Sequence, residues 1–150
     1  PDAATEIGRL MRGCGSRLGL EAEIVSLNFA RSLGRAVGRG AHLQAADGLV
    51  EELRVIKDAD EIKTLERSFA LNHAMLRWLE ESQLQPGRSE AELAWAIEKY
   101  FRDNGASELA FPSIVAVDRN AALPHAIPGE EKLPDNGLVL VDVGCRVDGY

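Results

Sequence analysis

Two residues of this 150-residue chain carry reactive side chains in settings that packing alone does not require. His125 lies in the stretch AALPHAIPG, between Pro124 and Pro128 and among apolar residues. Asp142 lies inside the apolar run GLVLVDVG, at positions 137–144. An imidazole can donate or accept a proton near neutral pH, and a carboxylate can move a proton or bind a metal ion. These two residues are therefore the first candidates for catalytic chemistry.

The prolines around His125 stiffen the backbone that carries it. The ring of Pro124 fixes its own φ angle, and Pro128 restricts Ile127 to extended conformations. A histidine on such a loop has little conformational entropy left to lose, which suits a catalytic or substrate-binding role. The same pattern also fits a surface histidine beside prolines that merely shape a turn. The residues alone leave both interpretations open.

The run around Asp142 is continuously apolar, which predicts a strand that is buried on both faces. A carboxylate there is costly unless it is paired, hydrogen-bonded or bound to a metal ion. The alternative is an aspartate that closes the strand by accepting backbone N–H groups near Gly144. Asp148-Gly149 predicts a hairpin turn, so a return strand from about Tyr150 would run beside Asp142. A second acid on that strand would begin a two-carboxylate metal site.

Two helices precede these segments and supply apolar faces for packing. The first is expected to begin at Asp58, which forms a capping pair with Glu61, and to end at Pro86-Gly87. Its core stripe is expected to hold the apolar residues at helical spacing: Ile62, Leu65, Phe69, Leu76 and Leu79.

The second helix begins with the capping box of Ser89 and Glu92 and ends at Gly105. Its expected apolar face consists of Leu93, Ile97, Tyr100 and Phe101. After it come two predicted strands, at 110–118 and 137–144. Helices followed by strands predict an α+β fold.

The first fifty or so residues read as mixed α/β. A short strand is expected at 21–26 and a helix from an Asn28 cap through Val37. Gly13 and Gly15 resemble the start of a dinucleotide-binding loop, but the third glycine of that motif is missing at its position, so we reject this site.

Composition excludes several classes of protein. The chain has 24 acidic and 17 basic residues and a formal net charge of −7, which argues against nucleic-acid binding. Its two cysteines, Cys14 and Cys145, form no metal-binding pair, which favours a reducing, cytoplasmic setting. No stretch predicts a membrane span or a secretory signal. Both ends look cut, so we expect a piece of a longer protein.

Several blocks of residues resemble a known family. RVIKDADEI, FPSIVAVDRNAALPHAIP and LVLVDVGCRVDGY, in this order, resemble the metallopeptidases with the pita-bread fold, and among them the Xaa-Pro aminopeptidases and Xaa-Pro dipeptidases (prolidases). The resemblance runs from about Leu53 to Tyr150. It implies that residues 54–150 are the first half of a pita-bread (creatinase/aminopeptidase-like) catalytic domain. Residues 1–53 would be the tail of the smaller α/β domain that precedes it.

The resemblance also implies roles for both candidate residues. Members of this family bind two divalent metal ions through two Asp, one His and two Glu. Asp142 matches the first Asp, and the remaining ligands would lie beyond residue 150. Such ligands suit Mn²⁺ or Co²⁺, with Zn²⁺ as a further option. His125 matches the family's separate catalytic histidine, which is not a metal ligand.

The implied function is that of a metal-dependent exopeptidase that hydrolyses X-Pro bonds, with a peptide carrying proline at its second position as substrate. A cytoplasmic homodimer that binds neither nucleic acid nor membrane is expected, and the chain alone should be inactive. The alternatives are a metal-free creatinase-like hydrolase and a non-catalytic binding or scaffold protein of the same fold. An acid on the return strand beside Asp142 would favour the peptidase.

Overall fold

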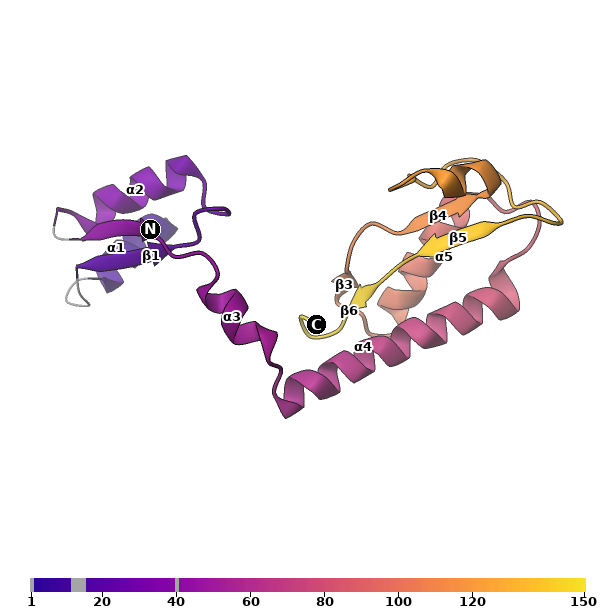
Figure 1. The fold of residues 1–150 in the computed structure, drawn as a ribbon, viewed down its shortest axis with the longest axis horizontal. Helices are drawn as coiled ribbons and strands as arrows, with labels where there is room; N and C mark the ends of the chain where they lie inside the picture. Colours follow the sequence, from indigo (N-terminus) through magenta and orange to yellow (C-terminus); the bar gives the residue numbers. More distant parts are fainter. Residues whose placement is uncertain (1, 12–15, 40) are drawn as a thin grey trace. The chain divides into compact units, whose positions relative to one another are not determined.

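The computed structural model describes residues 2–11, 16–39 and 41–150 (Figure 1). The chain separates into two compact units, Pro1–Lys57 and Asp58–Tyr150, and each is described here by itself. Cys14 and the rejected glycine motif at Gly13 and Gly15 lie outside the described residues. The expected division into domains at residues 53 and 54 stays a prediction.

The first unit is built around a pair of parallel strands. In chain order its elements are α1 (Ala3–Leu10), β1 (Arg17–Leu20), α2 (Leu27–Val37), β2 (His42–Ala45) and α3 (Leu49–Val55). Arg17 lies opposite His42 and Leu20 opposite Ala45 in the ladder. Parallel strands need a crossover connection, which α2 supplies. The mixed α/β character predicted for this region is confirmed.

Two details of the first unit differ from the sequence-based expectation. The predicted strand at 21–26 is wrong, because this segment turns: Ile24 and Val25 both donate their N–H groups to the carbonyl of Glu21. Helix α2 starts at Leu27 rather than after Asn28, and its cap is Ser26, whose Oγ accepts the N–H of Phe29 at 3.2 Å.

The second unit begins with a long helix, α4 (Ala59–Trp78), which continues as a π-helical turn, η1 (Leu79–Gln83). The predicted capping pair is confirmed. Asp58 Oδ1 accepts the N–H of Glu61 at 2.9 Å, and Glu61 Oε2 accepts the N–H of Asp58 at 2.7 Å. These bonds satisfy donors that the first turn of a helix otherwise leaves unpaired.

The core face of this helix matches the predicted stripe only in part: Leu79, in η1, is buried as predicted, but three of the other predicted residues are exposed. Ile62, Phe69 and Leu76 are 47%, 66% and 45% exposed, whereas Ser68 and Met75 are buried. Ser68 can enter the core because its hydroxyl donates a hydrogen bond to the backbone carbonyl of Cys145 at 3.0 Å. The face of α4 that is buried therefore depends on what packs against the helix, and the hydrophobicity of its residues alone did not identify it.

Helix α5 (Glu90–Asp103) forms the centre of the core. Its capping box of Ser89 and Glu92 is present as predicted, and Gly105 has φ +99° just beyond its end. Three predicted core residues of this helix are fully buried: Leu93, Ile97 and Phe101. They belong to one cluster with Met75, Leu79, Ala106, Val115, Val117, Leu133 and Cys145.

Two short antiparallel ladders complete the second unit. Strand β4 (Ile114–Val117) pairs with β5 (Val139–Asp142), and β3 (Glu108–Leu109) pairs with β6 (Cys145–Arg146). Figure 1 shows β4 and β5 side by side, and α5 packs against β4. A turn of 3₁₀ helix, η2 (Asp118–Ala122), follows β4 and leads into the segment that carries His125. The predicted strands are thus confirmed, with shorter extents.

Strand β5 is not buried on both faces. Val139 and Val141 are half-buried and turn toward the core, whereas Leu140 and Asp142 are exposed. The strand therefore has the alternating pattern of a sheet with one covered face among the described residues. The predicted burial of Asp142 is wrong for this reason.

The predicted hairpin turn after β6 is present. Asp148 and Gly149 have φ angles of +49° and +87°, and Val147 and Tyr150 exchange two backbone hydrogen bonds. The turn is held to the first half of α4, since Arg67 pairs with Asp148 and the Tyr150 hydroxyl donates to Glu61. Among the described helices, none combines the length and hydropathy needed to cross a membrane.

Candidate active site

The structure brings His125 and Asp142 to one hollow in the second unit. The hollow has a volume of about 680 Å³ and collects residues from the approach to β4, from the segment after η2 and from the end of β5. Its lining consists of Phe111, Pro112, Ser113, Ile114, His125, Ala126, Ile127, Pro128 and Asp142. The two residues singled out for chemistry thus share a mainly apolar site, although 17 positions separate them in the chain.

Asp142 is the last residue of β5 and lies opposite Ile114 of β4. Because cross-strand partners project from the same face, both residues lie on the open face of the ladder. The carboxylate is exposed and keeps its hydration, so the desolvation cost inferred from the apolar sequence does not apply. It is available to a ligand or to a metal ion.

His125 holds an unusual backbone conformation. Its φ angle is +55°, in the left-handed region that residues other than glycine seldom adopt. A residue held there costs on the order of 1–3 kcal/mol, and such residues cluster at functional sites. The flanking prolines predicted a stiff loop, but no residue in the sequence indicates the left-handed conformation. This strain favours a functional histidine over a surface histidine in an ordinary turn.

Ser113 is a lining residue that the sequence analysis did not identify. Its Oγ is buried and has no hydrogen-bond partner among the described residues. A buried hydroxyl is usually paired, so this one is an exception among the residues that line the hollow. Its only signal in the sequence is a polar residue at the start of an apolar strand, which is too common to be informative.

Glu90 was also missed, although it is the most buried carboxylate near the site. It is 1% exposed and accepts hydrogen bonds from the N–H of Val117 at 2.8 Å, from Asn120 Nδ2 at 2.9 Å and from the N–H of Gly129 at 3.0 Å. Burial by itself would raise the pKa of Glu90, but these three hydrogen bonds together hold that pKa below its usual value. Glu90 is therefore ionised at neutral pH.

The described residues do not make a metal site by themselves. They contain no group of three or more His, Cys, Asp or Glu side chains placed to hold an ion. Asp142 offers a hard oxygen donor of the kind that divalent cations prefer, but it is a single donor. The chemistry that these residues can perform unaided is hydrogen bonding and proton transfer at His125.

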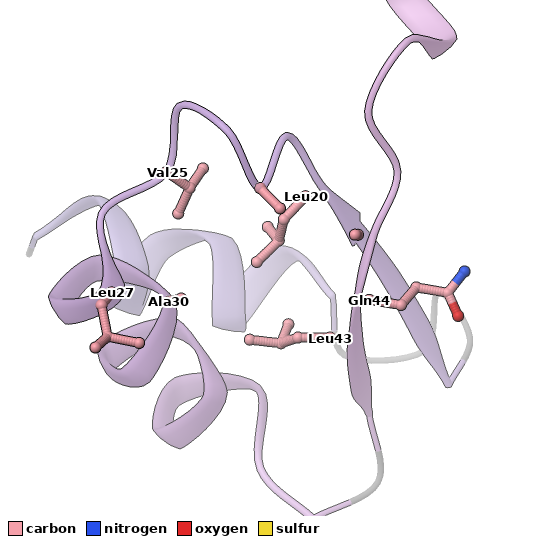
Figure 2. A pocket seen from close by; sticks show the side chains of 8 residues that line it. Leu20, Val25, Leu27, Ala30, Leu43 and Gln44 are labelled. Carbon is pink, nitrogen blue, oxygen red and sulfur yellow. The ribbon is translucent and has the colours of Figure 1, made fainter.

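A second hollow lies in the first unit. Figure 2 shows its aliphatic lining, with the amide of Gln44 directed away from the other labelled side chains. Its volume is about 350 Å³, and its lining consists of Leu20, Ala22, Val25, Leu27, Ala30, Leu43, Gln44 and Ala45. Because this lining has no titratable side chain, it is not a candidate catalytic site.

Comparison with known proteins gives this geometry its context. Residues 63–150 match the model of metallopeptidase family M24. The chain belongs to this family. It is 33% identical over 135 residues to an uncharacterized peptidase of Staphylococcus epidermidis, covering 90% of the chain and 38% of that protein. It is 30% identical over 105 residues to a Xaa-Pro dipeptidase of Pyrococcus furiosus, covering 69% of the chain and 30% of that protein.

The fold has a similar counterpart among solved structures. A Xaa-Pro dipeptidase from Bacillus anthracis superposes with a TM-score of 0.90 and 28% identity, over 100% of this chain and 42% of that one. The resemblance to pita-bread metallopeptidases, and the expected segment of that fold, are thereby confirmed. The M24 chain described here spans less than half the length of the relatives that it matches. Membership of a metallopeptidase family implies divalent metal ions.

Proposed function

We propose that this M24 chain is part of a metal-dependent exopeptidase that hydrolyses X-Pro bonds. The observation that carries the proposal is the shared hollow, whose mainly apolar lining includes both His125 and Asp142. Support comes from two relatives with Xaa-Pro dipeptidase in their names, one matched in sequence and one in fold. The substrate is a peptide with proline at its second position.

In this proposal His125 acts on the substrate and is not a metal ligand. Its imidazole donates a hydrogen bond to the oxygen of the scissile carbonyl as negative charge develops there, an interaction worth a few kcal/mol in other enzymes. The apolar side chains of Phe111, Ile114 and Ile127 offer a surface on which a proline ring can pack without losing hydrogen bonds. The stiff loop keeps the imidazole in place before the substrate arrives.

Asp142 has the metal-binding role. It supplies one carboxylate to a pair of divalent ions, Mn²⁺ or Co²⁺ with Zn²⁺ as a further option, and the other ligands come from residues beyond position 150. When bound, such ions supply Lewis acidity to the carbonyl and lower the pKa of water. Because Asp142 is a single donor, the 150-residue chain alone is inactive. The complete protein is a cytoplasmic homodimer in this proposal.

The test is metal removal and restoration in the complete protein. Chelation should abolish hydrolysis of an X-Pro dipeptide, and Mn²⁺ or Co²⁺ should restore it, while an X-Ala dipeptide remains a poor substrate throughout. The isolated 150-residue chain, assayed beside it with Mn²⁺, should show no turnover. Turnover that survives complete metal removal would contradict the proposal and favour a metal-free hydrolase. A metal-loaded protein without any peptidase activity would instead favour a scaffold.

A further inference from the structure

Glu90 connects the segment that carries His125 to the core. It is the first residue of α5 and lies next to the buried cap Ser89, so its backbone is fixed by the helix. Its carboxylate lies deep in the second unit and not in the hollow that His125 and Asp142 line. It therefore does not touch the site where substrate would bind, and any influence on catalysis must act through other residues.

The three donors to this carboxylate lie on both sides of His125 in the chain. Oε1 accepts from the N–H of Val117, at the end of β4, and from Asn120 Nδ2 in η2. Oε2 accepts from the N–H of Gly129, where the segment returns. One carboxylate thus fixes the two ends of the stretch 121–128, with His125 in its middle.

Backbone pairing holds only one of these two ends to α5. The returning end is fixed independently, because Ala91 donates to the carbonyl of Gly129 at 2.9 Å and Glu90 donates to that of Glu131 at 3.0 Å. The outgoing end at Asn120 reaches α5 through the side chain of Glu90. Asp118 also anchors η2, because its N–H donates to the carbonyl of Leu138 at 2.9 Å. The carboxylate of Glu90 adds a direct link between Asn120 and Gly129, and so constrains the path of the stretch between them.

The conformation of His125 makes such a constraint necessary. A residue with φ +55° relaxes to an ordinary conformation unless the surrounding structure prevents it. Three hydrogen bonds to a buried charge resist that relaxation, since breaking any one of them leaves a buried or half-buried polar group without this partner. We propose that Glu90 is a positioning residue that holds the His125 segment in its catalytic conformation. This inference rests on the proposed role of His125 in peptide hydrolysis.

Glu90→Gln in the complete, metal-loaded protein tests this role. Glutamine has nearly the same shape but only one acceptor oxygen, so at least one of the donors loses its partner. We expect kcat for an X-Pro dipeptide to fall by about 10- to 100-fold, the scale of a misplaced catalytic group, with metal content unchanged and KM within about twofold. The matched control is Glu92→Gln, two residues along the same helix, which keeps a side chain suited to the capping box and should leave kcat unchanged.

A double-mutant cycle separates positioning from general damage. If Glu90 acts through His125, then Glu90→Gln should have no further effect on kcat in a His125→Ala background. Multiplicative losses in the two variants would overturn the proposal, because they would show that Glu90 acts by another route. If Glu90→Gln does not fold, Asn120→Ala removes a single bond to the carboxylate and should give the same non-additive loss at smaller size.

Hydrogen exchange supplies a readout that does not depend on activity. Amides in 121–128 should exchange faster in Glu90→Gln than in the unmodified protein or in Glu92→Gln, while amides of β5 stay unchanged. Unchanged exchange in 121–128 would overturn the positioning role even if activity were lost. If the unmodified protein fails to hydrolyse X-Pro peptides but Glu90→Gln still loosens this stretch, the proposed function fails while the structural constraint stands.

Discussion

At the scale of single residues, His125 and Asp142 share one hollow but differ in what the structure adds to each. For His125 it adds a strained φ angle, which the prolines on either side did not reveal. For Asp142 the structure contradicts the expected burial, because the carboxylate is exposed on the open face of β5. The case for His125 thus becomes stronger, and the case for Asp142 rests on its neighbours and its chemistry.

His125→Ala in the complete protein should lower kcat for an X-Pro dipeptide by about 10²-fold or more, the loss seen when a donor to a developing oxyanion is removed. Metal content should stay the same, because the residue is not a ligand in our proposal. The measurement is steady-state kinetics together with elemental analysis. The control is Ile127→Ala. Ile127 also lines the hollow, but its side chain has no polar atom, so this substitution should affect KM more than kcat. Unchanged kinetics for His125→Ala would contradict a catalytic role and leave this residue only a structural role in the loop.

At the scale of elements, the features that sequence predicts well are those decided within one turn of the chain. Both capping boxes are of this kind, since Asp58 and Glu61, like Ser89 and Glu92, are three residues apart, and their bonds need no distant partner. The Asp148-Gly149 turn is equally local. The geometry of such patterns is decided by neighbouring residues, and the structure confirms both capping boxes and the turn.

Features decided by distant partners could not be predicted in this way. Ile62, Phe69 and Leu76 are at least as hydrophobic as Met75, yet Met75 is the buried one, because the packing of α5 and β6 selects the face of α4 that is buried. Glu90 shows the same limit, because its donors lie 27, 30 and 39 residues away. In the sequence it is simply an acid in the first turn of a helix.

The cap of α5 should make a measurable contribution to stability. Ser89→Ala removes the acceptor for the N–H of Glu92 at a buried helix end, and we expect a loss of about 1–2 kcal/mol in the free energy of unfolding. Urea denaturation of the complete protein measures it. Ser82→Ala, an exposed serine whose hydroxyl donates to the carbonyl of Trp78, serves as the control and should change stability by less than about 0.5 kcal/mol. Equal losses of unfolding free energy in the two variants would show that the cap stabilises the protein no more than an exposed serine does.

At the scale of the whole molecule, the chain matches only one part of the longer proteins that it resembles. It spans 38% of the staphylococcal relative and 42% of the Bacillus anthracis dipeptidase chain. Its second unit places a histidine and a carboxylate around an apolar hollow, while the described residues lack a complete set of metal ligands. The fold and the family could be predicted from blocks of sequence, because those blocks combine local structure with site residues. In our proposal, the metal centre forms only in the complete protein.

The most direct test is the metal content of the complete protein carrying Asp142→Ala, compared with that of His125→Ala. We expect Asp142→Ala to lose bound divalent metal and X-Pro hydrolysis together, because one carboxylate ligand is gone. His125→Ala should keep its metal and lose only turnover. Full retention of metal by Asp142→Ala, measured by elemental analysis after dialysis, would contradict the assignment of this residue as a ligand and with it the proposed metal centre.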